Sequence, residues 1–371
     1  MTASPKLRHS YTQKARQPAV LSLKVNFASD NTAPVAPAII DAIVKANEGH
    51  ARGYGDDDWT QRVERDLAEI FERELAVVLV ATGTAANALA LAQITPPWGV
   101  VFCHTESHIA TDECGAPEFF GGGLKLSGLP GDDGKIAPAV LEQALAGYGG
   151  HRPHQMIAST LSLTQASEAG TVYRTDEIAA LCAMAHQRSL AVHMDGARFA
   201  NALVRLNATP AQMTWRCGID VLSLGATKGG AMAAEAVIVF DPARAAFFGE
   251  RRKRAGHLLS KHRFLAVQMA AYLEHGRWLA LARQANVMAD RLAQRLTAIG
   301  LPPVWPVEAN LVFVVLPAAL DAKLKAAGAT YYARTSARLK LGIDAVLARL
   351  VTSFATQDDD IERFASLCEN F

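Results

Sequence analysis

Two segments decide the fold of this chain: LAVHMDGAR at residues 190–198 and VLSLGATKGG at residues 221–230. Each begins with a short apolar run, which is typical of a buried strand. Asp195, Arg198 and Lys228 follow where these two strands are predicted to end. Ligands of open α/β sheets bind beyond the carboxyl ends of the strands. We therefore expect these three side chains to share one site.

Short apolar runs alternate with amphipathic stretches from about residue 60 to residue 240. The runs predict buried strands at 76–81, 100–103, 156–161, 190–194, 221–224 and 236–240. Helical patterns lie between several of them, at 84–92, 138–146 and 175–188. This alternation indicates an α/β fold with a mainly parallel sheet covered on both faces.

The pattern changes after residue 240. It predicts one or two long helices over 263–299, a strand over 311–316, a helix from 318, a strand over 349–354 and a terminal helix from 358. A chain of 371 residues is long for a single core. We therefore predict a large domain at 26–262, a smaller C-terminal α+β domain at 263–371, and an N-terminal extension at 1–25.

Composition excludes several classes of protein. The 37 Lys and Arg residues balance 36 Asp and Glu residues, a formal net charge of +1. This balance gives no reason to expect nucleic acid or an anionic membrane as a partner. The five scattered cysteines form no CxxC pair, which favours reduced thiols over a disulfide framework or a metal site. We expect a cytoplasmic protein.

The residues at the predicted strand ends suit pyridoxal phosphate, which needs a lysine for a Schiff base and polar partners for its ring. Asp195 is a candidate partner of the pyridine nitrogen, although an acid at a strand end can also be a structural cap. Arg198 could reach the phenolic oxygen. Lys228 is flanked by glycines and alanines, and a desolvated amine loses its proton readily. A solvated surface lysine is the alternative.

Three further positions could complete such a site. Gly83 and Thr84 open a predicted helix, whose free N–H groups suit the cofactor phosphate. His108 could stack on the cofactor or transfer a proton, or be merely structural. Arg349, at the start of the predicted strand 349–354, could clamp a carboxylate or lie at the surface. Neither a Walker loop nor a complete GxGxxG motif supports a nucleotide site.

Together these motifs resemble the low-specificity L-threonine aldolases of the aspartate-aminotransferase-like superfamily. The resemblance runs from about Phe27 to the C-terminus and rests on ASDN (28–31), RGYGDD (52–57), TGT (82–84), His108, DGAR (195–198), Lys228 and RLVT (349–352). It implies the pyridoxal-phosphate fold type I, with a seven-stranded sheet and a smaller C-terminal domain. It also implies retro-aldol cleavage of L-threonine, L-allo-threonine or related β-hydroxy amino acids to glycine and an aldehyde.

The resemblance assigns further roles. It implies that Ser29 and Arg349 hold the substrate carboxylate. Tyr54 would enter the pocket from a neighbouring subunit of a homodimer or homotetramer. Arg263 would reach a partner's cofactor phosphate, with Lys261 near enough to compete.

The chain departs from its relatives where many carry a histidine near the substrate hydroxyl. Glu168 stands there instead, so the candidate bases are His108, a water near it, and Glu168.

Other functions stay open at this stage. The same cofactor residues would serve a β-eliminating lyase, a racemase, an aminotransferase or a phenylserine-type aldolase with a bulkier substrate. A non-catalytic binding protein that keeps the fold is the alternative from another class, and a nucleotide-dependent oxidoreductase is more distant. Intact Asp195, Arg198 and Lys228 favour the enzyme.

Overall fold

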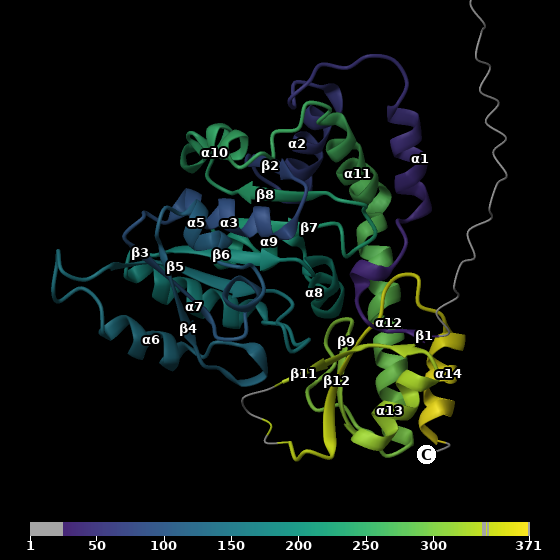
Figure 1. Ribbon diagram of the computed structural model, residues 1–371. Helices are drawn as coiled ribbons and strands as arrows, with labels where there is room; N and C mark the ends of the chain where they lie inside the picture. The colour runs from purple at the N-terminus through teal and green to yellow at the C-terminus, as the bar shows by residue number, and fades with distance from the viewer. Residues whose placement is uncertain (1–24, 336–338, 340, 370–371) are drawn as a thin grey trace, which may run out of the picture.

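A computed structural model describes residues 25–335, 339 and 341–369, and Figure 1 shows their arrangement. The chain forms a larger part around a central sheet and a smaller part that carries the C-terminus. Apart from Val25, the predicted N-terminal extension lies outside the described residues. In the ranges just given, no helix combines the length and the hydropathy needed to cross a bilayer.

The central sheet has seven strands in the order β2-β8-β7-β6-β5-β3-β4. Their bounds are β2 Ala76–Val80, β3 Gly99–His104, β4 Lys125–Leu129, β5 Ile157–Thr164, β6 Ala191–Gly196, β7 Val221–Gly225 and β8 Glu235–Val239. Both partners of β8 run antiparallel to it, and the other neighbouring pairs are parallel. The predicted mainly parallel sheet is confirmed. The sequence analysis missed β4, because Ser127 and Gly128 interrupt its apolar run.

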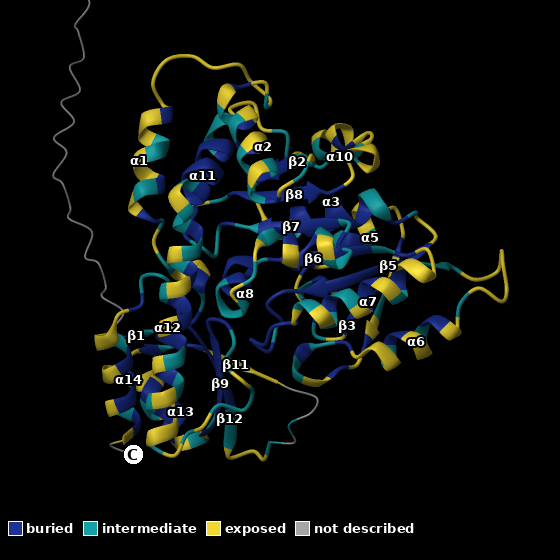
Figure 2. Cartoon of the chain, turned by 180° about the vertical axis from the view of Figure 1, so that it is seen from behind, coloured by how far each residue is buried: buried dark blue, intermediate teal, exposed yellow. Residues whose placement is uncertain are grey.

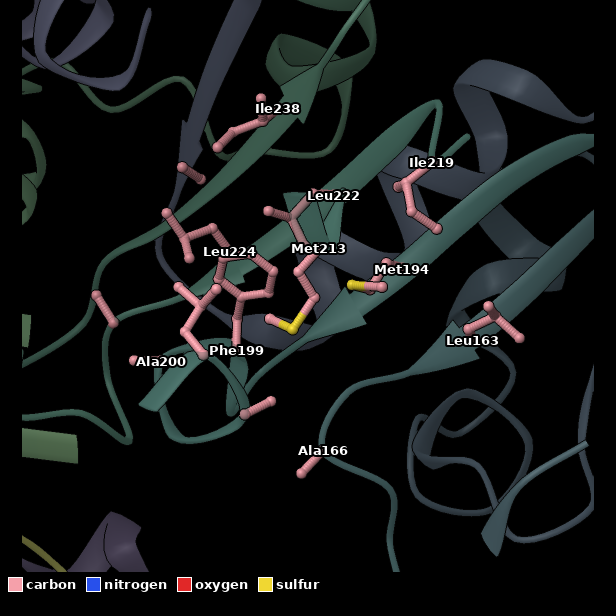
Figure 3. Close-up of a cluster of buried hydrophobic side chains, with 14 of the residues drawn as sticks. Leu163, Ala166, Met194, Phe199, Ala200, Met213, Ile219, Leu222, Leu224 and Ile238 are labelled. Atoms are coloured by element: carbon pink, nitrogen blue, oxygen red, sulfur yellow. The ribbon is translucent and has the colours of Figure 1, made fainter. Parts of the chain in front are cut away.

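Side chains alternate between the two faces of this sheet, as the pleat requires. On one face, Met194, Leu222 and Leu224 join Phe199 and other residues of the largest apolar cluster (Figure 3). On the opposite face, β6 presents His193 and Asp195 instead. This second face is covered by α3 (Gly83–Ile94), which contacts β6, β7 and β8. His193 and Asp195 therefore lie beneath α3.

Helices cover both faces, and Figure 2 shows the buried sheet between half-exposed helices. The remaining helices of the larger part are α1 Pro37–Ala46, α2 Asp58–Ile70, α4 His108–Thr111, α5 Ala116–Phe120, α6 Pro138–Ala146, α7 Thr175–Gln187, α8 Phe199–Leu206, α9 Pro210–Met213, α10 Phe248–Arg254 and α11 Arg263–Leu273. The predicted helices at 84–92, 138–146 and 175–188 correspond to α3, α6 and α7. No boundary of these three helices differs from its prediction by more than two residues.

The smaller part is built on the long helix α12 (Arg277–Ala298). Its three-stranded antiparallel sheet has the order β11-β12-β9. The bounds are β9 Leu311–Pro317, β11 Tyr332–Arg334 and β12 Ala345–Val351, with helices α13 Ala318–Ala326 and α14 Asp358–Glu369. The first described strand, β1 (Val25–Asn26), pairs in parallel with β10 (Ala329–Thr330), so the first described residues join the smaller part.

The predicted strand at 349–354 is wrong in its bounds. β12 begins four residues earlier, because Ala345–Ala348 pair with the segment from Val314 to Pro317 of β9. Arg349 therefore lies in the body of the strand, opposite Phe313 and Tyr332, rather than opening it. The apolar run from residue 345 carried the signal for the earlier start.

The helix α11 packs against α1 and α2 of the larger part, whereas α12 contacts α8 on one side and α14 on the other. Gly276, with φ 68°, lies between these two helices in the left-handed region that glycine adopts without strain. The domain boundary between residues 262 and 263 stays a prediction.

Phe199 is fully buried where the two parts meet, and its ring stacks between Phe71 and Trp278. We expect Phe199→Ala to lower the free energy of unfolding by about 3–5 kcal/mol, because truncation leaves a cavity among these rings. Urea unfolding followed by circular dichroism measures this. Val44→Ala on the exposed side of α1 is the control, and equal losses in the two variants would contradict the packing described.

Candidate active site

Two adjoining cavities open at the carboxyl ends of β6 and β7. The first, of about 370 Å³, is lined by Asp195 and by the start of α3, among others. The second, of about 460 Å³, is lined by Ser29 and Arg349 from the smaller part's side of the site. Asn31, His108 and Lys228 line both cavities. These three residues therefore stand where the two cavities meet.

Asp195 forms the wall of the first cavity at the end of β6. Its Oδ1 accepts a hydrogen bond from the backbone N–H of Ala197 at 3.0 Å. Its Oδ2 accepts one from Nδ2 of Asn87 on α3 at 2.9 Å. Asp195 is only 3% exposed. The two donors thus fix a buried carboxylate at the cavity wall.

Lys228 lies in the tight turn between β7 and β8. This turn is held from behind by the buried Glu235, which accepts the N–H of Ala226 at 2.8 Å. Burial raises the pKa of Glu235 to about 7, against the opposing effect of its hydrogen bonds and of the Lys228 charge. At Gly229 a Cβ would lie 2.2 Å from the hydroxyl of Tyr272, so no larger residue fits there. The glycines beside Lys228 are thus packing requirements of this turn.

The start of α3 supplies an anion site to the first cavity. The side chain of Thr82 accepts the N–H of Ala85 at 3.2 Å. The backbone N–H groups of Gly83 and Thr84 have no hydrogen-bond acceptor within the described residues. Free N–H groups and the positive end of the helix dipole favour a bound phosphate. The predicted cluster of Gly83, Thr84, Asp195 and Lys228 is brought together.

His108 opens the short helix α4 and is held by a buried carboxylate. Its Nδ1 lies 2.8 Å from Oε1 of Glu113. The hydrogen bond to Glu113 raises the pKa of His108, while burial works in the opposite direction. The structure thus places this imidazole between the two cavities.

Arg198 lies in the second cavity, away from the wall formed by Asp195. Its Nε and Nη2 donate to the two carboxylate oxygens of Asp30 at 2.8 and 3.0 Å. Asn310 also donates to Asp30. Burial raises the pKa of Asp30, but the charges of Arg198 and Lys228 and the hydrogen bonds from Asn310 and Arg198 together leave the pKa lowered. The contact from Arg198 to a cofactor oxygen stays a prediction.

The second cavity holds the candidate groups for a carboxylate. Arg349 is 7% exposed, and its Nε is buried without a hydrogen-bond partner among the described residues. Burial, followed by the nearby charge of Arg198, lowers the pKa of Arg349 to about 10. Ser29 and Glu168 line the same cavity. A guanidinium with an unsatisfied N–H can bind a substrate carboxylate strongly.

Two predicted site residues lie outside both cavities of this chain. Tyr54 is 55% exposed, with Lys253 above its ring. Arg263 donates to the carbonyl of Gly49 at 3.2 Å. Neither residue belongs to the lining of the two cavities, and nor does Lys261.

The structure adds Asp30, Asn87, Glu113 and Glu235 to the residues expected from the sequence. Asn87 comes one helical turn after Gly83, so helical periodicity could have placed it toward the same cavity. Asp30 stands in the ASDN motif, but no local pattern joins it to Arg198, 168 positions away. Glu113 follows His108 by five residues, a spacing that no regular element predicts to be in contact.

Comparisons with known proteins show the family of this chain. The family model for beta-eliminating lyases matches residues 26–319. This chain belongs to the beta-eliminating lyase family. It is 44% identical over 290 residues to a low specificity L-threonine aldolase of a Pseudomonas species, covering 78% of this chain and 83% of that protein. A second such aldolase, from Pseudomonas aeruginosa, is 42% identical over 82% of this chain and 88% of its own length.

Solved structures support the same assignment. The structure of a threonine aldolase from Leishmania major matches with a TM-score of 0.86 and 29% identity, covering 93% of this chain and 99% of that one. A serine palmitoyltransferase from Sphingomonas wittichii, at 14% identity and a TM-score of 0.69, shares the fold. The predicted fold type I is confirmed.

This family of lyases uses pyridoxal 5′-phosphate, and the residues of the first cavity fit that group. A buried carboxylate, Asp195, suits the pyridine nitrogen, and Lys228 suits the aldehyde. The unpartnered N–H groups of Gly83 and Thr84 suit the phosphate. One cavity is thus lined by the Asp195 carboxylate, the Lys228 amine and the N–H groups of Gly83 and Thr84.

We expect Asp195→Asn to weaken binding of pyridoxal phosphate about tenfold or more, because a hydrogen bond to a charged group contributes about 1.5–3 kcal/mol. Titration of the protein with the cofactor, followed by visible absorbance, measures this. The control is Asp241→Asn, which removes an exposed carboxylate at the start of a surface turn. Equal affinities in wild type and Asp195→Asn would contradict the fit.

Proposed function

We propose that this chain cleaves the Cα–Cβ bond of L-threonine, L-allo-threonine or related L-β-hydroxy-α-amino acids to glycine and an aldehyde, reversibly. One arrangement carries the proposal: His108 and Lys228 line both the cofactor-sized cavity and the cavity that holds Arg349. The relatives at 42–44% identity are low specificity L-threonine aldolases, which supports the same reaction.

Bound pyridoxal phosphate supplies an electron sink that stabilises negative charge at Cα. In our proposal Asp195 keeps the proton on the ring nitrogen, so that the sink stays effective. Lys228, which lines the first cavity, would hold the cofactor through its side-chain amine. Gly83 and Thr84 anchor the phosphate through their N–H groups, which keeps the ring in one position.

The second cavity orients the substrate. In our proposal Arg349 and Ser29 bind its carboxylate, and Asp30 holds Arg198 rigidly beside them. His108, a water near it, and Glu168 are the candidate groups that remove the β-hydroxyl proton, in that order. His108 comes first because it lines both cavities, whereas Glu168 lines the second cavity only.

We further propose that the chain works as a homodimer or homotetramer. Tyr54 and Arg263 lie outside the cavities of their own chain, and in an oligomer each could enter the site of the neighbouring subunit. A cytoplasmic location is part of the proposal and is supported by the five cysteines, which are free thiols.

The products formed from L-threonine test the reaction. We expect protein supplied with pyridoxal phosphate to release acetaldehyde and glycine in equal amounts, detected by coupled assay and amino-acid analysis. Lys228→Ala should abolish this turnover, because the amine that holds the cofactor is gone. If 2-oxobutyrate formed instead, the protein would be an eliminating lyase. Full activity in Lys228→Ala would contradict the mechanism.

A mixing experiment tests the shared site. Tyr54→Ala and Lys228→Ala should each be nearly inactive alone. Because an isologous dimer has two equivalent sites, hybrids of the two variants would contain one intact site, and activity should return to about a quarter of wild type. Refolding the variants together and assaying threonine cleavage measures this. An unimpaired Tyr54→Ala, or no recovery in the mixture, would contradict an interface role for Tyr54.

A further inference from the structure

A buried chain of hydrogen bonds joins His108 to Asp195. Nδ1 of His108 lies 2.8 Å from Oε1 of Glu113. Asn87 donates through Nδ2 to the same Oε1 of Glu113 at 2.8 Å, and to Oδ2 of Asp195 at 2.9 Å. The chain thus links the imidazole between the two cavities to the carboxylate in the wall of the first.

Glu113 has no direct access to either cavity. Its side chain is 0% exposed, and it does not belong to the lining of the first or the second cavity. It cannot therefore touch substrate or cofactor. Whatever it does for the reaction must pass through His108 or Asn87.

Asn87 is the link between two buried acids. Its amide has two hydrogens, and the structure directs one to Glu113 and the other to Asp195. Two neighbouring carboxylates in a dry environment repel each other, and one of them would tend to take up a proton. A shared donor stabilises the ionised form of both. Asparagine suits this position because aspartate would add a third acid.

The hydrogen bond to Glu113 also determines which ring nitrogen of His108 can accept a proton. A carboxylate accepts a hydrogen bond, so Nδ1 of the ring carries the donated proton. In the neutral imidazole, Nε2 is then the unprotonated nitrogen and can accept a proton. The opposite tautomer would leave Nε2 protonated and unable to act as a base.

We propose that Glu113 and Asn87 are positioning residues: Glu113 fixes the ring and tautomer of His108, and Asn87 ties this pair to Asp195. The inference deepens the proposed function, since it rests on His108 as the group that moves the β-hydroxyl proton. Protonation at His108 and charge at Asp195 are then coupled through the protein interior.

Other charges also face His108 and contribute to its titration. They come from the ends of β5, β6 and β7, from the C-terminus of α4, and from β11 and β12: Glu168, Asp195, Arg198, Lys228, Asp112, Arg334 and Arg349. Among the described residues, Glu113 is the one that hydrogen-bonds to the ring, and this bond has the largest effect on the pKa of His108. Burial raises the pKa of Glu113, and the bonds from His108 and Asn87 oppose that rise.

The test measures the titration of His108 itself. Diethyl pyrocarbonate acylates a histidine only in its neutral form. The rate of modification of the peptide that contains His108, followed by mass spectrometry at each pH, therefore gives the pH midpoint of its titration. The midpoint is measured on the full chain without cofactor, in the wild type and in three variants: Glu113→Gln, Asn87→Leu and Glu106→Gln. The last is the matched control, because Glu106 lies two residues from His108 and its carboxylate does not bond to the ring.

We expect the midpoint of His108 to move to lower pH in Glu113→Gln, because the anion that stabilises the imidazolium is gone. Asn87→Leu should shift it in the same direction, since Glu113 loses a donor to its ionised form. Glu106→Gln should leave it unchanged. The pH dependence of kcat/KM for threonine cleavage should shift likewise in Glu113→Gln. Glu113→Leu, which also loses the orientation of the ring, should in addition lower kcat/KM by up to roughly 100-fold, the lower end of what a positioned general base contributes.

An unchanged midpoint in both Glu113→Gln and Asn87→Leu would overturn the proposal, even in an active aldolase. A midpoint shift in Glu106→Gln as large as that in Glu113→Gln would also overturn it, because any nearby carboxylate would then have the same effect. The titration needs no turnover, so it separates this proposal from the proposed function. A shifted midpoint in a protein that cleaves no β-hydroxy amino acid would support the coupling while the aldolase reaction failed.

Discussion

A buried carboxylate at the end of β6 is the constraint on which the rest of the site depends. Asp195 is almost fully enclosed, and a buried charge without partners is strongly unfavourable. The N–H of Ala197 and the side-chain amide of Asn87 donate the hydrogen bonds that this carboxylate needs. α3 therefore lies across β6 with Asn87 directed at Asp195. The start of the same helix is then directed at the first cavity. One electrostatic requirement thus positions both the residue that we propose for the ring nitrogen and the N–H groups that we propose for the phosphate.

The two faces of the central sheet have different roles. One face is apolar and packs into the main core (Figure 3), which stabilises the scaffold. The α3 face carries a row of polar groups across the strands, in which His193 is held between the hydroxyls of Ser162 and Ser223. Burial lowers the pKa of His193 to about 4, so this imidazole is neutral at physiological pH. The titratable side chains that β6, β8 and the turn after β7 present to the first cavity are Asp195, Glu235 and Lys228.

The sequence predicted those parts of the site that depend on local patterns. Asp195, Lys228 and Thr84 each follow a recognisable strand, and parallel strands bring their ends together. Contacts between distant segments were not predictable in this way. Asp30 follows β1, which pairs with β10 in the smaller part of the molecule. Its hydrogen bond to Arg198 holds that guanidinium at the second cavity. The apolar run from residue 345 could have placed Arg349 inside its strand, but its pairing opposite Phe313 of β9 depends on the register of the two strands, which no local pattern gives.

The central claim is that the polar face beneath α3 binds pyridoxal phosphate through Lys228. Its most direct test is to load the protein with the cofactor, reduce it with borohydride and locate the modified lysine by peptide mass spectrometry. The account predicts one modified residue, Lys228, and loss of the label when excess amino acid is added before reduction. Label spread over surface lysines, or a single label at another lysine, would contradict it.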